Sequence, residues 1–164
     1  MNSQEFKTRI DHPHKVWLGG HLGITVNGYL DIDLHDDRLA VEIKSRYDRY
    51  RSVFTIHHYQ YVQYPGIHEG KELYWAFLLY GLRNQTGAIS LSDIETCARN
   101  RRAWFLPWDF VKGFKVSNPK TGPYIYVNKK SFENLPFTEH KVQGGKLYLP
   151  PNAPELEKRL EMPF

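Results

Sequence analysis

The sequence predicts an α/β fold, a single domain in which a central mixed β-sheet is flanked by helices. The chain of 164 residues has the size of one ordinary domain, roughly 100–200 residues. Strand-like and helix-like segments alternate along it with short breaks, which is typical of α/β domains. Aromatic residues make up 15% of the chain, which suits a core of large side chains and excludes a disordered chain.

The first half of the chain carries the clearest periodic patterns. Alternation of apolar and polar residues predicts half-buried strands, and a continuous apolar run between turn residues predicts a fully buried strand. In order, we expect a short helix over 2–9 before the breakers Pro13 and Gly19–Gly20, strands over 24–34 and 39–45, a helix within 53–64 that ends at Pro65–Gly66, and a buried strand over 72–81.

The second half is read from capping and breaker residues. Ser92 followed by Glu95 is a capping box, which predicts a helix over 93–101. We expect further elements in this order: a strand over 102–106 stopped by Pro107, a short helix over 109–112, β-segments over 123–127 and 146–149, and a short helix between the prolines of the tail.

Composition excludes several classes of protein. Cys97 is the only cysteine, so a disulfide scaffold is excluded. No run of 18 apolar residues occurs, so no membrane span is expected. The first residues lack the apolar stretch of a signal peptide. We therefore expect an intracellular, cytoplasmic, soluble protein.

The net charge of +4 is unevenly distributed. Eight basic residues and one acid lie between Arg99 and Lys130, and in a second cluster arginines alternate with Tyr47 and Tyr50. Cations beside flat rings suit a nucleic-acid backbone and its unstacked bases, although a solvated basic face is the alternative interpretation. The candidate nucleic-acid-binding residues are Arg46, Arg49, Arg51, Arg99, Arg101 and Arg102.

The stretch 28–46 has the pattern of a β-hairpin whose strands each have one apolar and one charged face. If Asp36–Asp37 form a two-residue turn, Asp31 lies opposite Glu42. Opposed carboxylates destabilise a strand pair and favour a compensating cation. Mg²⁺ takes such oxygen ligands, and Lys44 projects from the same face as Glu42. Two carboxylates and a lysine suit metal-assisted phosphodiester hydrolysis, whereas a wet outer sheet face is the alternative.

With these residues in place, the chain resembles the PD-(D/E)XK nuclease superfamily, and its archaeal Holliday junction resolvase-like branch in particular. The motif is Asp31, ten residues, and then Glu42-Ile43-Lys44, and the resemblance extends to Val111. It implies that Asp31 and Glu42 bind a metal ion and that Lys44 is catalytic. It also implies a restriction-endonuclease-like core over about 24–112, followed by a basic, β-rich extension over about 113–164.

The resemblance leaves three positions open. The family has a glutamine on the helix after the Glu-x-Lys strand, and Gln60 is preferred here over Gln63. Its first helix often carries a further glutamate, for which Glu5 is the candidate. Asp33 is a rival for Asp31 because both lie on the same face of the predicted strand.

The expected function is that of a Mg²⁺-dependent DNA endonuclease, with Mn²⁺ as a substitute. Asp31, Glu42, Lys44 and Gln60 form the catalytic set, and the main-chain carbonyl of Ile43 is a further metal ligand. A homodimer is expected because one site cuts one strand. A small stand-alone nuclease suits a virus, a mobile element or a repair system. The alternatives are a nucleic-acid-binding protein that does not cleave, and a restriction-type, homing-type or RNA-directed nuclease of the same fold.

Overall fold

The computed structural model describes residues 3–26, 31–49, 52–81, 98–120 and 122–161. The chain is a single mixed α/β domain built on a six-stranded mixed sheet that helices flank, as the sequence predicts. Within the described residues, no helix has the length and apolar character needed to cross a membrane.

The main sheet has the order β1-β2-β4-β5-β9-β8. Its pairs β2·β4 and β5·β9 are parallel, and β1·β2, β4·β5 and β8·β9 are antiparallel. The strands are β1 (Leu34–His35), β2 (Leu39–Tyr47), β4 (Glu72–Tyr80), β5 (Arg101–Pro107), β8 (Thr138–Val142) and β9 (Gly145–Leu149).

A smaller antiparallel sheet has the order β3-β7-β6, with β3 (Val53–His57), β7 (Tyr124–Asn128) and β6 (Val116–Ser117). The residues after 112 therefore supply strands to both sheets. The helical segments are α1 (Ser3–Phe6), the π-helical turn η1 (Lys7–Asp11), α2 (His12–Leu22), α3 (His58–Ile67), the 3₁₀ turns η2 (Trp108–Val111) and η3 (Lys129–Ser131), and α5 (Pro154–Glu161).

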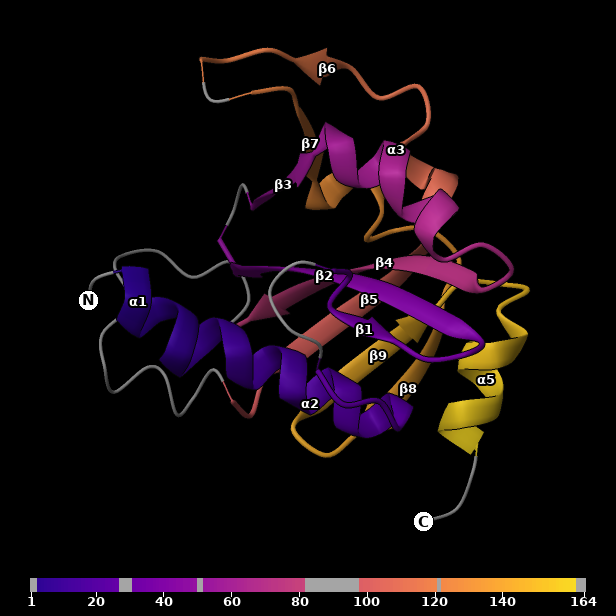
Figure 1. Cartoon of the computed structure of the whole chain (residues 1–164). Helices are drawn as coiled ribbons and strands as arrows, with labels where there is room; N and C mark the ends of the chain where they lie inside the picture. Colours follow the sequence, from indigo (N-terminus) through magenta and orange to yellow (C-terminus); the bar gives the residue numbers. More distant parts are fainter. Residues whose placement is uncertain (1–2, 27–30, 50–51, 82–97, 121, 162–164) are drawn as a thin grey trace.

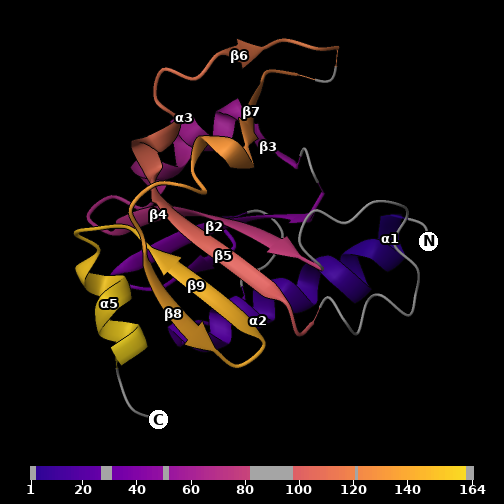
Figure 2. The same ribbon diagram turned by 180° about the vertical axis from the view of Figure 1, so that it is seen from behind.

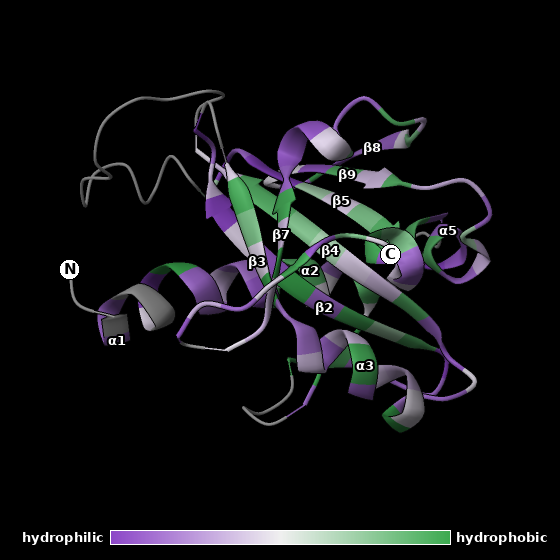
Figure 3. Cartoon of the chain, turned by 90° about the horizontal axis from the view of Figure 1, so that it is seen from above, coloured by the Kyte–Doolittle hydropathy of each residue, from purple (hydrophilic) through white to green (hydrophobic). Residues whose placement is uncertain are grey.

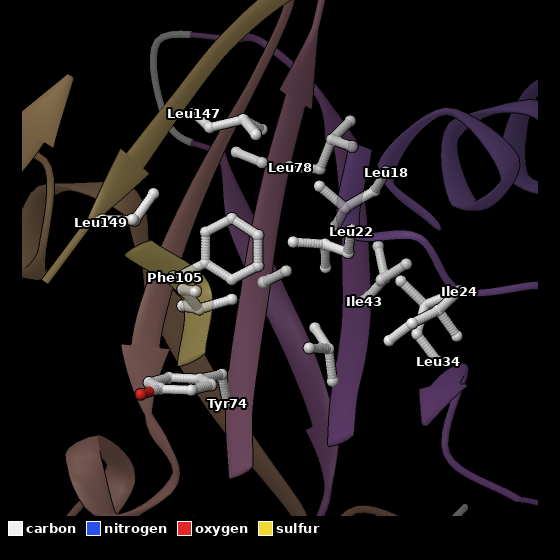
Figure 4. Close-up of a cluster of buried hydrophobic side chains, with 14 of the residues drawn as sticks. Leu18, Leu22, Ile24, Leu34, Ile43, Tyr74, Leu78, Phe105, Leu147 and Leu149 are labelled. Carbon is white, nitrogen blue, oxygen red and sulfur yellow. The ribbon is translucent and has the colours of Figure 1, made fainter. Parts of the chain in front are cut away.

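The main sheet is covered on both faces (Figures 1 and 2). On one face, Leu18 and Leu22 of α2 pack with Ile43 and Phe105 of the sheet (Figure 4). On the other face lie the small sheet and α3, and Phe54 packs with strand residues in a second buried cluster. Both faces of the central strands are thus buried, and the continuous apolar run of β4 suits this position (Figure 3).

The expected break at Pro13 and Gly19–Gly20 is wrong, because these residues lie inside α2. Pro13 is in the first turn of the helix. A main-chain N–H at this position has no acceptor within the helix, so proline, which lacks that group, is tolerated. A Cβ on Gly19 would collide with the carbonyl oxygen of Ile24, so glycine allows the chain to return tightly against the helix. The helix ends at Gly23, whose φ of 73° is left-handed.

The helix expected within 53–64 is confirmed as α3, which begins at His58, but the residues before it form strand β3, which was not expected. Phe54 and Ile56 point inward while β3 pairs with β7, a long-range contact that local patterning does not reveal. Pro65 does not end α3. Pro65 has no N–H to donate to the carbonyl of Tyr61. That carbonyl instead accepts a hydrogen bond of 3.0 Å from Trp108 Nε1.

The long strand expected over 24–34 is reduced to Leu34–His35 among the described residues. The expected helix over 93–101 lies mostly outside the described residues, and Arg101 at its end opens β5. The strands expected over 72–81, 102–106, 123–127 and 146–149 are confirmed as β4, β5, β7 and β9 to within two residues at each end.

Candidate active site

The hairpin between β1 and β2 has a different register from the expected one. His35 pairs with Ala40, and Asp36 N donates to the carbonyl oxygen of Leu39 at 2.9 Å, so Asp37–Arg38 form the turn. The cause lies in Asp36, whose Oδ1 accepts hydrogen bonds from the main-chain N–H groups of Arg38 and Leu39. The expected turn at Asp36–Asp37 is therefore wrong.

This register brings Asp33 rather than Asp31 against Glu42. Asp33 N donates to Glu42 Oε1 at 3.1 Å, and Ile43 N donates to Asp33 Oδ2 at 2.8 Å. The two carboxylates thus lie side by side at the β1–β2 edge of the main sheet. The expected pairing of Asp31 with Glu42 is wrong, and its rival Asp33 occupies that place.

Glu42, Lys44 and Gln60 form a closed triangle of hydrogen bonds. Lys44 Nζ donates to Glu42 Oε2 at 3.2 Å and to Gln60 Oε1 at 2.8 Å, and Gln60 Nε2 donates to Glu42 Oε2 at 3.0 Å. Glu42 and Lys44 lie on the face of β2 that α3 covers, and Gln60 is buried on the first turn of α3. Gln63 lines the cavity but is exposed, so Gln60 is the helix amide that meets the predicted residues.

The surroundings of Glu42 disfavour its ionised form. Burial, followed by the charge of Asp33, raises the pKa of Glu42 to about 8, although Lys44 and its hydrogen bond act in the opposite direction. Glu42 is only 5% exposed. A cation placed between the two carboxylates would relieve this repulsion.

Two further residues from the N-terminal helices join the site. Lys15 Nζ lies 2.7 Å from Asp33 Oδ1 and 3.4 Å from Asp11 Oδ2, and Asp11 Oδ1 accepts from Ser45 Oγ at 3.1 Å. Burial would lower the pKa of Lys15, but the neighbouring carboxylates outweigh it and raise that pKa. Sequence analysis missed both residues, because the residues 11–23 appeared to be a broken link rather than a helix. Glu5, the expected acid of the first helix, is exposed on α1.

Asp31 lies in a different environment at the rim of the same cavity. Its Oδ1 is 2.8 Å from His68 Nε2 and its Oδ2 is 3.2 Å from His35 Nε2. Ile32 N also donates to Oδ1 at 2.7 Å. Burial opposes these hydrogen bonds, but they hold the pKa of Asp31 below its usual value.

A cavity of about 1040 Å³ opens over these groups. Its wall combines the carboxylates and Lys44 with basic residues and aromatic rings from α2, β2, β3 and α3. Besides the carboxylates, Lys15 and Lys44, it includes His12, Arg46, His57, Tyr59 and Tyr64. This volume is at the upper end of the range of ligand sites in proteins, roughly 300–1,000 Å³.

The predicted nucleic-acid-binding arginines do not share one surface. Arg46 is exposed and lines the cavity, and Arg49 is exposed two residues beyond the end of β2. Arg51 lies outside the described residues. Arg99 and Arg102 line a separate cavity of about 820 Å³ at the Gly81 end of β4. Of the described arginines, only Arg46 therefore lines the carboxylate cavity.

Arg101 is at odds with its expected role as a phosphate contact. It is 8% exposed, and its guanidinium donates to His14 Nδ1 at 2.7 Å and to the Ala98 carbonyl at 3.0 Å. Burial and the charge of Arg101 lower the pKa of His14 to about 3, so His14 is a neutral acceptor. Arg102 forms an ion pair of 2.7 Å with the buried Asp48.

The donor set fits a hard divalent cation better than a zinc ion. Among the described residues, no group of three or more histidine, cysteine or carboxylate side chains is arranged to hold a metal ion. Asp33, Glu42 and the Ile43 carbonyl would instead supply oxygen ligands from adjacent positions, leaving room for water. Mg²⁺ is commonly held in this way, by one or two carboxylates with several waters retained.

Comparisons with known proteins give no match: no protein-family model fits the chain, and searches of curated proteins and of solved structures find no similar protein.

Proposed function

We propose that the chain is a divalent-metal-dependent nuclease that hydrolyses phosphodiester bonds, with DNA as its substrate and Mg²⁺ or Mn²⁺ as its cofactor. One observation carries the proposal: the carboxylates of Asp33 and Glu42 lie side by side, and Lys44 is fixed beside Glu42 by Gln60. Asp33 takes the metal-binding position that the sequence motif had given to Asp31.

Asp33, Glu42 and the Ile43 carbonyl would hold the metal ion. When bound, such an ion polarises a phosphoryl oxygen and lowers the pKa of a bound water. The Lys44 ammonium stands beside Glu42 and orients the attacking water, and its hydrogen bond to Gln60 holds it there. The water oxygen bonds to phosphorus while one ester P–O bond breaks. The water gives up a proton and the departing oxygen takes one, so the products are a phosphomonoester and an alcohol.

Arg46 supports a nucleic-acid substrate. It projects from β2 two residues beyond Lys44, lines the same cavity and reaches Thr55 Oγ1 at 3.4 Å. A cation at this distance along the strand can hold a phosphate next to the one that is cut. Because each site cuts one strand, we further propose that two protomers act together on a duplex or a junction.

The test is a cleavage panel with supercoiled plasmid, linear duplex, four-way junction and duplex RNA, each with Mg²⁺, Mn²⁺ or EDTA. We expect metal-dependent products with DNA and a loss of about 10²-fold or more in Glu42→Gln and in Lys44→Met. The matched controls are Glu161→Gln and Lys158→Met, which remove an exposed acid and an exposed lysine from α5.

Three results would contradict the proposal in different ways. Equal cutting by the two site variants and the controls would reject the assigned residues. Salt-sensitive DNA binding with no products and no metal dependence would favour a binding protein that does not cleave. Products from RNA alone would keep the chemistry and change the substrate.

A further inference from the structure

The N-terminal helix α2 brings a second ammonium group into the site. Lys15 Nζ bridges Asp33 Oδ1 at 2.7 Å and Asp11 Oδ2 at 3.4 Å. The helix that carries Lys15 is anchored by Leu18 and Leu22, which are fully buried beneath the main sheet. The position of the lysine at the carboxylates is therefore set by packing rather than by a loose surface contact.

Each carboxylate of the central pair has its own lysine. Lys44 contacts Glu42, and Lys15 contacts Asp33, whose other oxygen accepts from Ile43 N. The Lys15 side chain is 23% exposed, so it borders the cavity and can reach a ligand there. Asp11 pairs with the Lys15 ammonium through one oxygen and accepts a hydrogen bond from Ser45 Oγ through the other.

The formal charges indicate how many metal ions the site can accept. With every group ionised, the carboxylates of Asp11, Asp33 and Glu42 and the ammonium groups of Lys15 and Lys44 leave one net negative charge. One divalent ion and one phosphodiester make the cluster neutral. A second divalent ion would leave two uncompensated positive charges in a partly buried site, which is unfavourable.

We propose that Lys15 is a second catalytic lysine that takes the place of a second metal ion, so the site works with a single divalent ion. This inference rests on the proposed nuclease function. As the ester P–O bond breaks, the Lys15 ammonium donates a hydrogen bond and then a proton to the departing oxygen. Water then returns a proton to Lys15, while the proton lost by the attacking water goes to solvent.

The first experiment counts metal ions in the absence of substrate. Mn²⁺ is titrated into the full chain, and free Mn²⁺ is followed by electron paramagnetic resonance. We expect one bound ion per wild-type protomer and per Lys15→Arg protomer. Lys15→Ala should take a second, weaker ion as Mn²⁺ is raised, because Asp11 and Asp33 are then free and the doubly loaded site has one positive charge fewer than it would have in wild type. Lys158→Ala is the matched control and should bind one ion.

The second experiment follows plasmid cleavage against Mn²⁺ concentration. We expect Lys15→Ala to cut about 10²-fold more slowly than wild type at low Mn²⁺. Raising Mn²⁺ should restore part of this loss, because a second ion then supplies the missing positive charge. Adding Asp11→Asn to Lys15→Ala should abolish the restoration and the second bound ion together. Thermal unfolding of each variant confirms that it is folded.

Two bound ions in wild type would overturn the proposal, and so would a single ion in Lys15→Ala at every Mn²⁺ concentration. Wild-type rates in Lys15→Ala at low Mn²⁺ would also overturn it. A wild-type protein that neither binds Mn²⁺ nor cuts any nucleic acid would instead remove the nuclease function itself. The two failures are therefore distinguished by the wild-type measurements alone.

Discussion

Asp31 and Asp33 lie two residues apart and point into one cavity, but their surroundings differ. Asp33 faces a second carboxylate and a lysine, and its side chain is 14% exposed. Asp31 faces two histidines, and its side chain is 35% exposed. Both aspartates have hydrogen-bond donors around them, but of the two only Asp33 also lies against a second carboxylate. The cross-strand register decides which aspartate faces Glu42.

We expect Asp31 to have a structural rather than a metal-binding role, because its neighbours are two histidines rather than a second carboxylate. Lys71 Nζ lies 3.1 Å from His68 Nδ1, so the ammonium donates to that nitrogen and the proton of a neutral His68 is on Nε2. That proton is donated to Asp31 Oδ1, which also accepts from Ile32 N. Asp33, in contrast, lies against the carboxylate of Glu42, and a cation would relieve the repulsion between these two groups.

The largest expected difference between Asp33 and Asp31 is in the rate of cleavage. We expect Asp33→Asn to lower the rate of metal-dependent cleavage by about 10²–10³-fold, because it removes a charge that would hold the proposed metal ion. Asp31→Asn should stay within about tenfold of wild type, at or below the low end of the roughly 10–100-fold loss that is typical of residues that support a metal site. Plasmid nicking under single-turnover conditions measures both. If Asp31→Asn were the more damaging change, the two aspartates would exchange roles.

The second effect is on metal affinity as a function of pH. Glu42 must lose a proton to bind a cation, since burial and Asp33 raise its pKa to about 8. We expect the affinity for Mn²⁺ to rise by up to about tenfold per pH unit between pH 6 and 8, because one proton is released for each ion bound. Calorimetric titration in buffers of different ionisation enthalpy counts that proton.

Asp31→Asn is the matched control for this slope, because the pKa of Asp31 is already low and it releases no proton in that range. The slope should therefore be unchanged in Asp31→Asn. A flat affinity in the wild-type protein would mean that Glu42 is ionised without metal, and the contrast between the two carboxylate environments would disappear.

Most strands of the fold could be predicted from the sequence, whereas only some residues of the candidate site could. The strands β2, β4, β5, β7 and β9 could be predicted, because alternation marks a strand with one buried face and a continuous apolar run marks a strand with two. Glu42 and Lys44 were expected on one face because alternate residues of a strand share a face, and Gln60 was chosen from the family resemblance. The structure places all three within hydrogen-bond distance of one another.

The remaining site residues depend on contacts that no local pattern contains. The register of the hairpin depends on the side chain of Asp36, which the distant Arg159 holds by two hydrogen bonds of 2.6 and 3.0 Å. A shift of the turn by one residue exchanges Asp31 for Asp33. Lys15 was missed because glycines and a proline, which usually interrupt helices, occur within α2. This helix is stabilised by packing against the sheet.

The third effect is on the pH dependence of stability, where Glu42 and Asp31 should act in opposite directions. The folded state holds a proton on Glu42 that the unfolded chain loses above about pH 4.5. The free energy of unfolding therefore falls as pH rises from 4.5 towards 8. We expect Glu42→Gln to remove this fall and to raise the melting temperature at pH 8 by about 5 °C, measured in EDTA.

Asp31 contributes stability with the opposite sign. Its folded pKa lies below the ordinary 3.8, so its contribution is present above that pH and is lost as pH falls through the lowered value. Asp31→Asn should therefore melt below wild type at pH 7, and the two curves should converge at low pH. Parallel curves for the two variants would show that neither carboxylate titrates as its surroundings require.

The smallest effect concerns Lys71. It contacts His68, which forms with His35 and Asp31 a histidine cluster apart from the Asp33–Glu42 pair. Lys71→Met removes the donor to His68 Nδ1, so His68 can place its proton on either nitrogen and holds Asp31 less firmly. We expect the melting temperature to fall by about 2 °C, a size typical of one lost hydrogen bond in a chain of this length. Cleavage should remain within about twofold of wild type, with Lys158→Met as the matched control.

If cleavage fell as far as in Lys44→Met while the melting temperature stayed constant, the histidine cluster would take part in catalysis. The separation of the two aspartates into a catalytic and a structural one would then fail.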